Sequence, residues 1–149
     1  MARTIAIAAI CLTMLAVSAR KGIDSYEIYL NGKLLLRQVA DRSFSLQSLH
    51  LNASQSDEKL VIYYYQCNAP SGTGKGRSIS VKDGNGRILK EWKFADAAEG
   101  NGGMPIPVKE ILQLAKGTGI LHFYYVSGER PKGQILASFQ RGEKNTATK

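Results

Sequence analysis

A glycine-rich segment is the first part of the chain with a chemical signature, because it looks like a phosphate-binding loop. Residues 69–76 read Ala-Pro-Ser-Gly-Thr-Gly-Lys-Gly and follow an apolar run. A nucleotide-binding loop needs a Ser or Thr after its lysine to hold magnesium, and a helix whose N-terminus faces the phosphates. Gly76 stands where that hydroxyl is needed, and residues 78–81 alternate as a strand does. We therefore expect no nucleotide site here, and we expect no cofactor.

The side chains that could serve catalysis or metal binding are scattered. His50, Cys67 and His122 are far apart in the chain and offer no close-spaced pair of zinc ligands. A Cys67–His122 nucleophile pair would lack a third residue to orient the base. No two carboxylates are marked as the partners that glycoside hydrolysis requires. We expect no metal site and no catalytic residues, so the pattern favours a non-enzymatic protein over a hydrolase.

Aromatic residues are a further candidate, because seven Tyr and one Trp could form a platform that stacks against sugars. Aromatic side chains at alternate strand positions more often form core and cross-strand pairs. Trp92 shares its expected strand face with Ile88 and Phe94, so we predict that all three lie in the core. Burial is also the favoured prediction for Cys67, since free cysteine is among the most buried residue types.

Basic residues in loops are the binding candidates that remain. If each connection reverses the chain, the loops at 38–43, 68–77, 95–103 and 127–133 fall at one end of the domain. That end would gather five cations, which are Arg42, Lys75, Arg77, Arg130 and Lys132. Loops on a rigid scaffold commonly carry binding residues. We expect these cations to bind an anionic partner; the alternative is that they are ordinary solvated charges, diluted by the neighbouring acids Asp41, Asp96, Glu99 and Glu129.

The elements that hold these loops follow from an alternation of period two between residues 23 and 141. Strands are predicted at 26–30, 33–39, 44–51, 60–67, 78–82, 87–94, 120–126 and 134–140. Asn31-Gly32 and the turn at 83–86 lie between such segments and are strong hairpin signals. Pro105 and Pro107 restrict residues 104–108 to an extended edge segment.

One helix is predicted at Lys109–Lys116, where Val108, Ile111, Leu112 and Ala115 recur at helical spacing before Gly117. Strands joined by tight hairpins pair antiparallel, which predicts an all-β fold. The expected architecture is an antiparallel two-layer β-sandwich of immunoglobulin-like size with this one short helix. A small β-barrel is the alternative, because the pattern predicts strands and not whether a sheet closes.

The N-terminal segment has the organisation of a secretory signal. Arg3 precedes an apolar run from Ile5 to Val17, and Val17-Ser18-Ala19 supplies the small residues that signal peptidase prefers. The run is shorter than the ~20 residues of a membrane-spanning helix. We predict a signal peptide at 1–19, a single β-sandwich domain at 20–141 and a disordered basic tail at 142–149, with no transmembrane helix after cleavage.

Charge and export together limit the partners. The formal net charge of the chain is +8, and a basic protein in the periplasm or outside the cell meets anionic glycans, lipid surfaces and other proteins, but not nucleic acid. The sequence therefore predicts an exported, non-enzymatic binding or accessory module for an anionic glycan or a protein partner. The alternative is a structural or assembly protein of the cell envelope that works by edge-strand pairing.

Overall fold

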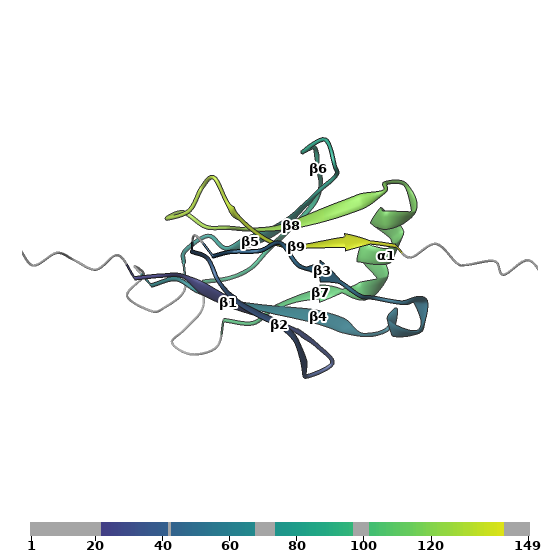
Figure 1. Cartoon of the computed structure of the whole chain (residues 1–149), viewed down its shortest axis with the longest axis horizontal. Helices are drawn as coiled ribbons and strands as arrows, with labels where there is room; N and C mark the ends of the chain where they lie inside the picture. The colour runs from purple at the N-terminus through teal and green to yellow at the C-terminus, as the bar shows by residue number, and fades with distance from the viewer. Residues whose placement is uncertain (1–21, 42, 68–73, 97–101, 142–149) are drawn as a thin grey trace, which may run out of the picture.

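The computed structural model of the protein describes residues 22–41, 43–67, 74–96 and 102–141 (Figure 1). The expected signal peptide, Arg42 and the expected tail at 142–149 lie outside these residues. Two β-sheets face each other, with one α-helix at one end of the molecule, so the predicted all-β sandwich is confirmed. The sheets remain separate and do not form the small barrel that we weighed as the alternative. Within the described ranges, no helix has the length and apolar character needed to cross a membrane.

The four-stranded sheet has the order β2-β1-β4-β7, and its neighbouring strands all pair antiparallel. Its strands are β1 (Ser25–Leu30), β2 (Lys33–Val39), β4 (Lys59–Tyr65) and β7 (Met104–Pro107). The hairpin between β1 and β2 turns at Asn31-Gly32, where both residues adopt a positive φ, as predicted. β7 lies at the sheet edge, because Pro105 and Pro107 lack the N–H groups that a further strand would require.

The five-stranded sheet has the order β3-β9-β8-β5-β6. Its strands are β3 (Ser48–Leu49), β5 (Ser78–Lys82), β6 (Ile88–Lys93), β8 (Ile120–Val126) and β9 (Gln134–Gln140). The segment after the glycine-rich residues is the strand β5, as predicted, whereas a phosphate-binding loop would lead into a helix. The helix α1 (Val108–Lys116) begins one residue before the predicted start and buries Val108, Ile111 and Ala115.

The predicted strand at 44–51 is reduced to the two residues of β3, which pair parallel with β9. The prediction of a full antiparallel strand was therefore wrong. β2 belongs to the four-stranded sheet and β3 to the five-stranded sheet, so the chain between them crosses from one layer to the other and cannot pair along its whole length. The crossing ends where the backbone N–H of Ser138 donates to the carbonyl of Gln47 at 2.9 Å.

The core lies between the two sheets and follows the alternation of the strands. In β1 every second side chain is buried, and β4 continues the same pattern with Leu60, Ile62 and Tyr64. Three core tyrosines form a continuous stack, in which Tyr64 lies between Tyr26 at 6.2 Å and Tyr125 at 3.9 Å between ring centroids. The stack joins the layers, since Tyr26 and Tyr64 belong to the four-stranded sheet and Tyr125 to the other.

The face predicted for β6 was wrong at one residue. Trp92 and Phe94 pack partly buried against the core, but Ile88 is 61% exposed. Lys90 pairs with Val81 and Ile88 pairs with Lys82, so the register shifts by one residue between them. A bulge of this kind exchanges the two faces of a strand. It turns Ile88 to the solvent and lets Leu89 pack against the core instead.

The contrast between two isoleucines tests where the core lies. Ile62 is fully buried and Ile88 is mostly exposed. We expect Ile62→Ala to lower the free energy of unfolding by about 2–5 kcal/mol, through lost burial and the cavity left behind. The same substitution at Ile88 should cost less than about 1 kcal/mol. Urea denaturation followed by circular dichroism measures both, and equal losses would contradict this assignment of the core.

Candidate functional site

The described loops meet at one end of the sandwich, called here the loop pole, which comprises residues 74–77, 95–96 and 127–133. The end is on the left of Figure 1, and α1 lies at the opposite end. Backbone contacts join the loops: the N–H of Gly128 donates to the carbonyl of Lys75 at 2.8 Å, and the N–H of Gly76 donates to the Asp96 carboxylate at 2.7 Å. The sequence analysis predicted that the candidate cations gather at the loop pole. Which of them are exposed and which are paired decides what the loop pole can bind.

Arg77 is buried and structural. Its side chain lies beneath the loops, with the residue only 3% exposed. Its guanidinium donates from Nη1 to the carbonyl of Gly102 at 2.8 Å and from Nη2 to the carbonyl of Ala95 at 2.7 Å, while Nε has no partner among the described residues. These bonds tie the start of β5 to the segment that leads into β7. Arg77 therefore joins the two layers, and its guanidinium is largely engaged by these internal bonds.

Arg130 is held by a buried carboxylate. Its Nη2 lies 2.5 Å from Oδ2 of Asp24, and the Asp24 side chain is 3% exposed. Asp24 also accepts hydrogen bonds from the Tyr64 hydroxyl at 2.8 Å and from the Cys67 backbone N–H at 3.0 Å. Because Asp24 precedes β1 and Arg130 lies between β8 and β9, the ion pair bridges the two sheets. Burial raises the pKa of the Tyr64 hydroxyl above its usual range, and the hydrogen bond to Asp24 raises it further.

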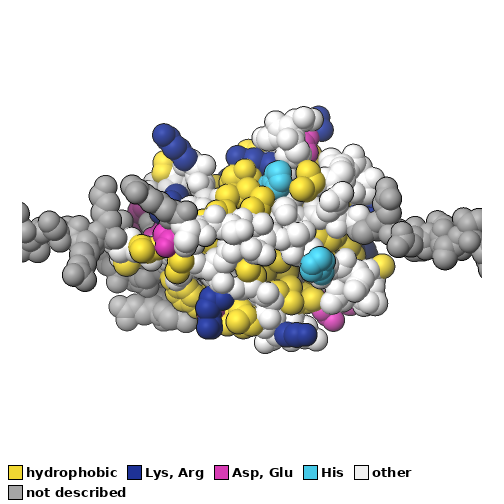
Figure 2. Space-filling model, viewed as in Figure 1, with side chains coloured by type: hydrophobic (Ala, Val, Ile, Leu, Met, Phe, Trp, Pro, Cys, Tyr) yellow, Lys and Arg dark blue, Asp and Glu magenta, His cyan; other side chains and the backbone are white. Residues whose placement is uncertain are grey.

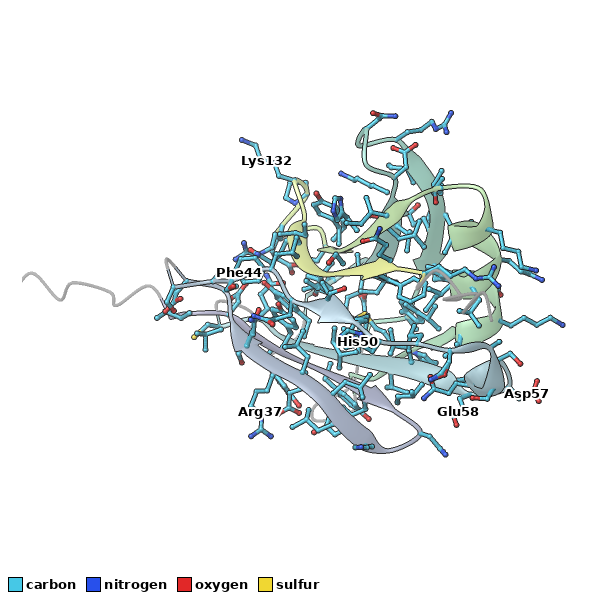
Figure 3. All side chains as sticks on the ribbon, turned by 45° about the vertical axis from the view of Figure 1, so that its right-hand side comes forward. Arg37, Phe44, His50, Asp57, Glu58 and Lys132 are labelled. Atoms are coloured by element: carbon cyan, nitrogen blue, oxygen red, sulfur yellow. The ribbon has the colours of Figure 1, made fainter. Side chains whose placement is uncertain are left out.

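Lys75 and Lys132 are the predicted cations whose side chains are exposed. Figure 3 shows Lys132 projecting from the β8–β9 loop into solvent. The backbone N–H of Lys75 donates to the Glu129 carboxylate at 3.0 Å, and this bond lowers the pKa of Glu129. The loop pole thus brings Lys75, Arg77, Arg130 and Lys132 to one end, but it uses two of them as clamps and places Glu129 beside a third.

A pocket of about 530 Å³ opens at the loop pole between β5, β6 and the end of β8. The charged residues in its lining are Arg77, Lys93 and Glu91, and the Glu91 carboxylate accepts a hydrogen bond from the Ser78 hydroxyl at 2.8 Å. Lys75, Arg130 and Lys132 do not line it. Of the predicted cations that the structure describes, only Arg77 therefore lines this cleft, in which two cations lie with one acid.

A second cavity lies at the other end of the sandwich, between α1 and the short 3-10 helix η1 (Ala53–Gln55). We call it the basic groove. It encloses about 640 Å³ and is lined by Leu51, Asn52, Ala53, Ser54, Ser56, Lys109, Leu112, Gln113, Lys116 and Arg141. Its volume falls in the range of small-molecule sites, roughly 300–1,000 Å³. Among these lining residues are three cations and no acid.

The helix presents its cations to the basic groove because its opposite face is buried. Val108, Ile111 and Ala115 pack into the core, which turns Lys109, Gln113 and Lys116 toward solvent. The backbone N–H of Val108 donates to the carbonyl of Glu58 at 3.1 Å and fixes the start of α1 beside the turn that follows η1. Figure 3 places Asp57 and Glu58 in that turn, and neither lines the groove. Glu110, on another side of α1, binds Trp92 and Lys90.

The histidines and the cysteine do not assemble. Figure 2 shows the two histidines as separate patches on one face of the molecule, and the residues that the structure describes contain no group of three potential ligands for a metal. Cys67 is an exposed free thiol, so the prediction of burial was wrong. β4 ends at Tyr65 and Gln66 is the last buried residue of this run, which leaves Cys67 on the way out of the sheet.

The basic groove was only partly accessible to reasoning from the sequence. Lys109 and Lys116 are seven residues apart in the predicted helix, and this spacing places two side chains on one helix face. Nothing local links them to Leu51, Ser54 or Arg141, which come from distant parts of the chain. Comparisons of the chain with protein-family models, with curated proteins and with solved structures found no match. Function must therefore be inferred from these residues and their geometry.

Two acids at this end of the sandwich, buried Asp24 and exposed Glu129, should differ sharply in structural importance. Asp24→Ala removes three hydrogen-bond acceptor contacts and leaves Arg130 and the Tyr64 hydroxyl without their partner. We expect a loss of about 3 kcal/mol in the free energy of unfolding, measured by urea denaturation. Glu129→Ala also removes a carboxylate bound to a backbone N–H, but this one is exposed, and the midpoint should hardly move. Equal losses of unfolding free energy for the two variants would show that the Asp24–Arg130 ion pair between the sheets has no special role.

Proposed function

We propose that the protein is an exported, non-enzymatic binding module that takes an anionic oligosaccharide in the basic groove. The observation that carries this proposal is the composition of the groove lining, in which three cations stand without an acid around a floor that includes Leu51 and Leu112. The hydroxyls of Ser54 and Ser56 and the amides of Asn52 and Gln113 supply donors and acceptors suited to sugar hydroxyls.

The spacing of the cations favours an extended ligand with regularly placed charges. Lys109 and Lys116 are separated by two turns of α1, which is about 10 Å along the helix axis. This is comparable with the length of one disaccharide unit. A glycan with one carboxylate or sulfate in each disaccharide would therefore present an anion to both lysines, while Arg141 meets it from the end of β9. Because these cations are exposed, their attraction for an anionic glycan should weaken as the salt concentration rises.

An assembly protein of the cell envelope is the alternative. β2 is a free edge of its sheet and contains no proline, unlike β7. Its residues Leu34 and Leu35 are 39% and 36% exposed, which would suit pairing with another strand. The glycan proposal has the stronger support, because a cavity whose lining holds three cations and no acid favours one class of ligand, whereas an open strand edge favours none.

The groove proposal is tested by a double substitution, Lys109→Gln with Lys116→Gln. The probe is a hexasaccharide of alternating glucuronate and N-acetylglucosamine, and binding is measured by isothermal titration calorimetry at two salt concentrations. We expect the double variant to bind about twofold to thirtyfold more weakly, since each exposed ion pair contributes about 0.2–1 kcal/mol. Binding by the unaltered protein should weaken as salt rises.

A matched control removes the same charge from the loop pole, by Lys75→Gln with Lys132→Gln. This variant should bind the hexasaccharide as the unaltered protein does. Loss of affinity in this variant alone would move the anion site to the loop pole and refute the groove. Absence of binding by the unaltered protein, together with stable self-association, would support the assembly alternative.

Export is proposed from the N-terminal pattern alone, in which Arg3 precedes the apolar run and Ala19 closes the small-residue site. When the full chain is made in cells that process such signals, the mature protein should begin at Arg20 and be recovered outside the cytoplasm. Intact mass spectrometry of each cell fraction measures this. A full-length chain found only in the cytosol would contradict export.

A further inference from the structure

The outer face of the four-stranded sheet carries a group of tyrosines that the core does not use. Tyr29 projects from β1, and Tyr63 and Tyr65 project from β4, each on the face opposite to the buried side chains of its strand. The rings of Tyr29 and Tyr63 stand at 84° to each other with 5.6 Å between centroids. Tyr65 is two residues further along β4 and is 45% exposed. We call these three residues the tyrosine corner.

Tyr63 forms the floor of the tyrosine corner because the neighbouring residue has no side chain. Gly103 immediately precedes Met104, which pairs with Ile62, so Gly103 lies beside Tyr63. A Cβ built on Gly103 would be 3.2 Å from Cε1, Cζ and the hydroxyl oxygen of Tyr63 alike. A point equally distant from these three atoms lies out of the ring plane, to one side of it, and next to the edge that carries Cε1 and the hydroxyl. The Tyr63 ring therefore leans over Gly103 with its hydroxyl edge, and Tyr29 stands beside it as a wall.

A carboxylate and a guanidinium complete the corner. Glu27 pairs across the sheet with Tyr63 on one side and with Arg37 on the other, so these three residues form one row. The Glu27 carboxylate accepts from the Tyr29 hydroxyl at 2.8 Å, from Nε of Arg37 at 2.6 Å and from the Tyr65 hydroxyl at 3.5 Å. Figure 3 shows Arg37 projecting outward from β2, away from the core.

The polar groups of this row are poised for recognition of neutral hydroxyls. The hydrogen bond from Tyr29, followed by that from Arg37, holds the pKa of Glu27 below its usual value, so the carboxylate is ionised at neutral pH. Glu27 balances the charge of Arg37, which means that the row offers acceptors and donors without a net charge. A carboxylate has about four acceptor positions, of which Glu27 uses three, and a guanidinium has five donors, of which Arg37 uses one for Glu27, so both can still bind a hydroxyl.

We propose that the tyrosine corner is a binding site for a neutral, β-linked pyranose, with the flat face of one sugar ring laid on Tyr63. A pyranose whose substituents are all equatorial presents axial C–H bonds from its two faces. The face of an aromatic ring carries negative charge density, which attracts such C–H groups. The sugar hydroxyls at the ring edge then meet Glu27 and Arg37, and Tyr65 extends the platform toward the next sugar. This site is independent of the basic groove, which lies elsewhere on the molecule and selects charge.

A tyrosine on the opposite sheet provides the matched comparison. Tyr124 lies on the outer face of β8, where Nζ of Lys82 sits 4.2 Å from its ring centroid. The ammonium occupies the ring face that a sugar would need. Tyr124 is therefore a surface tyrosine in a strand, of the same chemical type, but a cation lies over one face of its ring and no second aromatic ring among the described residues stands beside it.

The test is titration of the full protein with cellohexaose by calorimetry, combined with saturation-transfer NMR on the sugar. We expect binding that salt does not weaken, with the strongest saturation on ring C–H protons. Tyr65→Ala, an exposed substitution that should leave the fold intact, and Tyr63→Ala should each weaken binding by about threefold to tenfold, the range expected for one aromatic contact. Glu27→Gln should weaken it while leaving the sheet folded. Tyr124→Ala should bind as the unaltered protein does.

The outcomes separate this site from the groove. The double variant Lys109→Gln with Lys116→Gln should bind cellohexaose with full affinity. A negative result for one of the two proposed sites therefore does not refute the other. The tyrosine corner is refuted if the unaltered protein does not bind the neutral sugar at millimolar concentration. It is also refuted if Tyr124→Ala reduces affinity as much as Tyr65→Ala does.

Discussion

The burial of the Asp24 carboxylate between the two sheets is the interaction on which the loop end of the molecule depends. A buried charge is costly unless it is paired and hydrogen-bonded. Asp24 meets this condition by binding Arg130, the Tyr64 hydroxyl and a backbone N–H together. The Tyr64–Tyr125 stack lies next to this cluster, so an ion pair and an aromatic contact join the layers at the same end.

This requirement changes what the cations at that end can do. Arg77 makes a second connection between the layers, by donating hydrogen bonds to the backbone carbonyls of Ala95 and Gly102. Arginine suits such a role because its fork of donors satisfies several acceptors at fixed geometry. Buried backbone carbonyls in loops need partners, and Arg77 provides them, while Arg130 neutralises the buried Asp24 carboxylate. At the loop pole only Lys75 and Lys132 remain exposed among the described candidate cations, whereas at α1 Lys109 and Lys116 line a groove together with Arg141.

Both proposed binding surfaces use the rigidity of regular elements. The basic groove takes two lysines from the solvent side of α1, whose other side is locked in the core, and adds Arg141 from the end of β9. The tyrosine corner takes its row of Arg37, Glu27 and Tyr63 from three paired strands whose register places them side by side. Groups positioned by strands and helices lose little freedom on binding, which favours affinity from few contacts. In these two proposals, charge would select the ligand at the basic groove, and the shape of the sugar ring would select it at the tyrosine corner.

The sequence by itself determined the strands, the two hairpin turns and α1, because these depend on local alternation, positive φ and helical spacing. It also placed the loops of the described region at one end, since each reversal of an antiparallel chain is a local event. Only the tertiary structure decided which charges remain free: Asp24 and Arg130 are far apart in the chain, and nothing near either residue indicates that they pair. The bulge that exposes Ile88 and the layer crossing that shortens β3 arise in the same way, from pairing between segments. A binding site is a property of which side chains are left without internal partners, and that is settled by long-range packing.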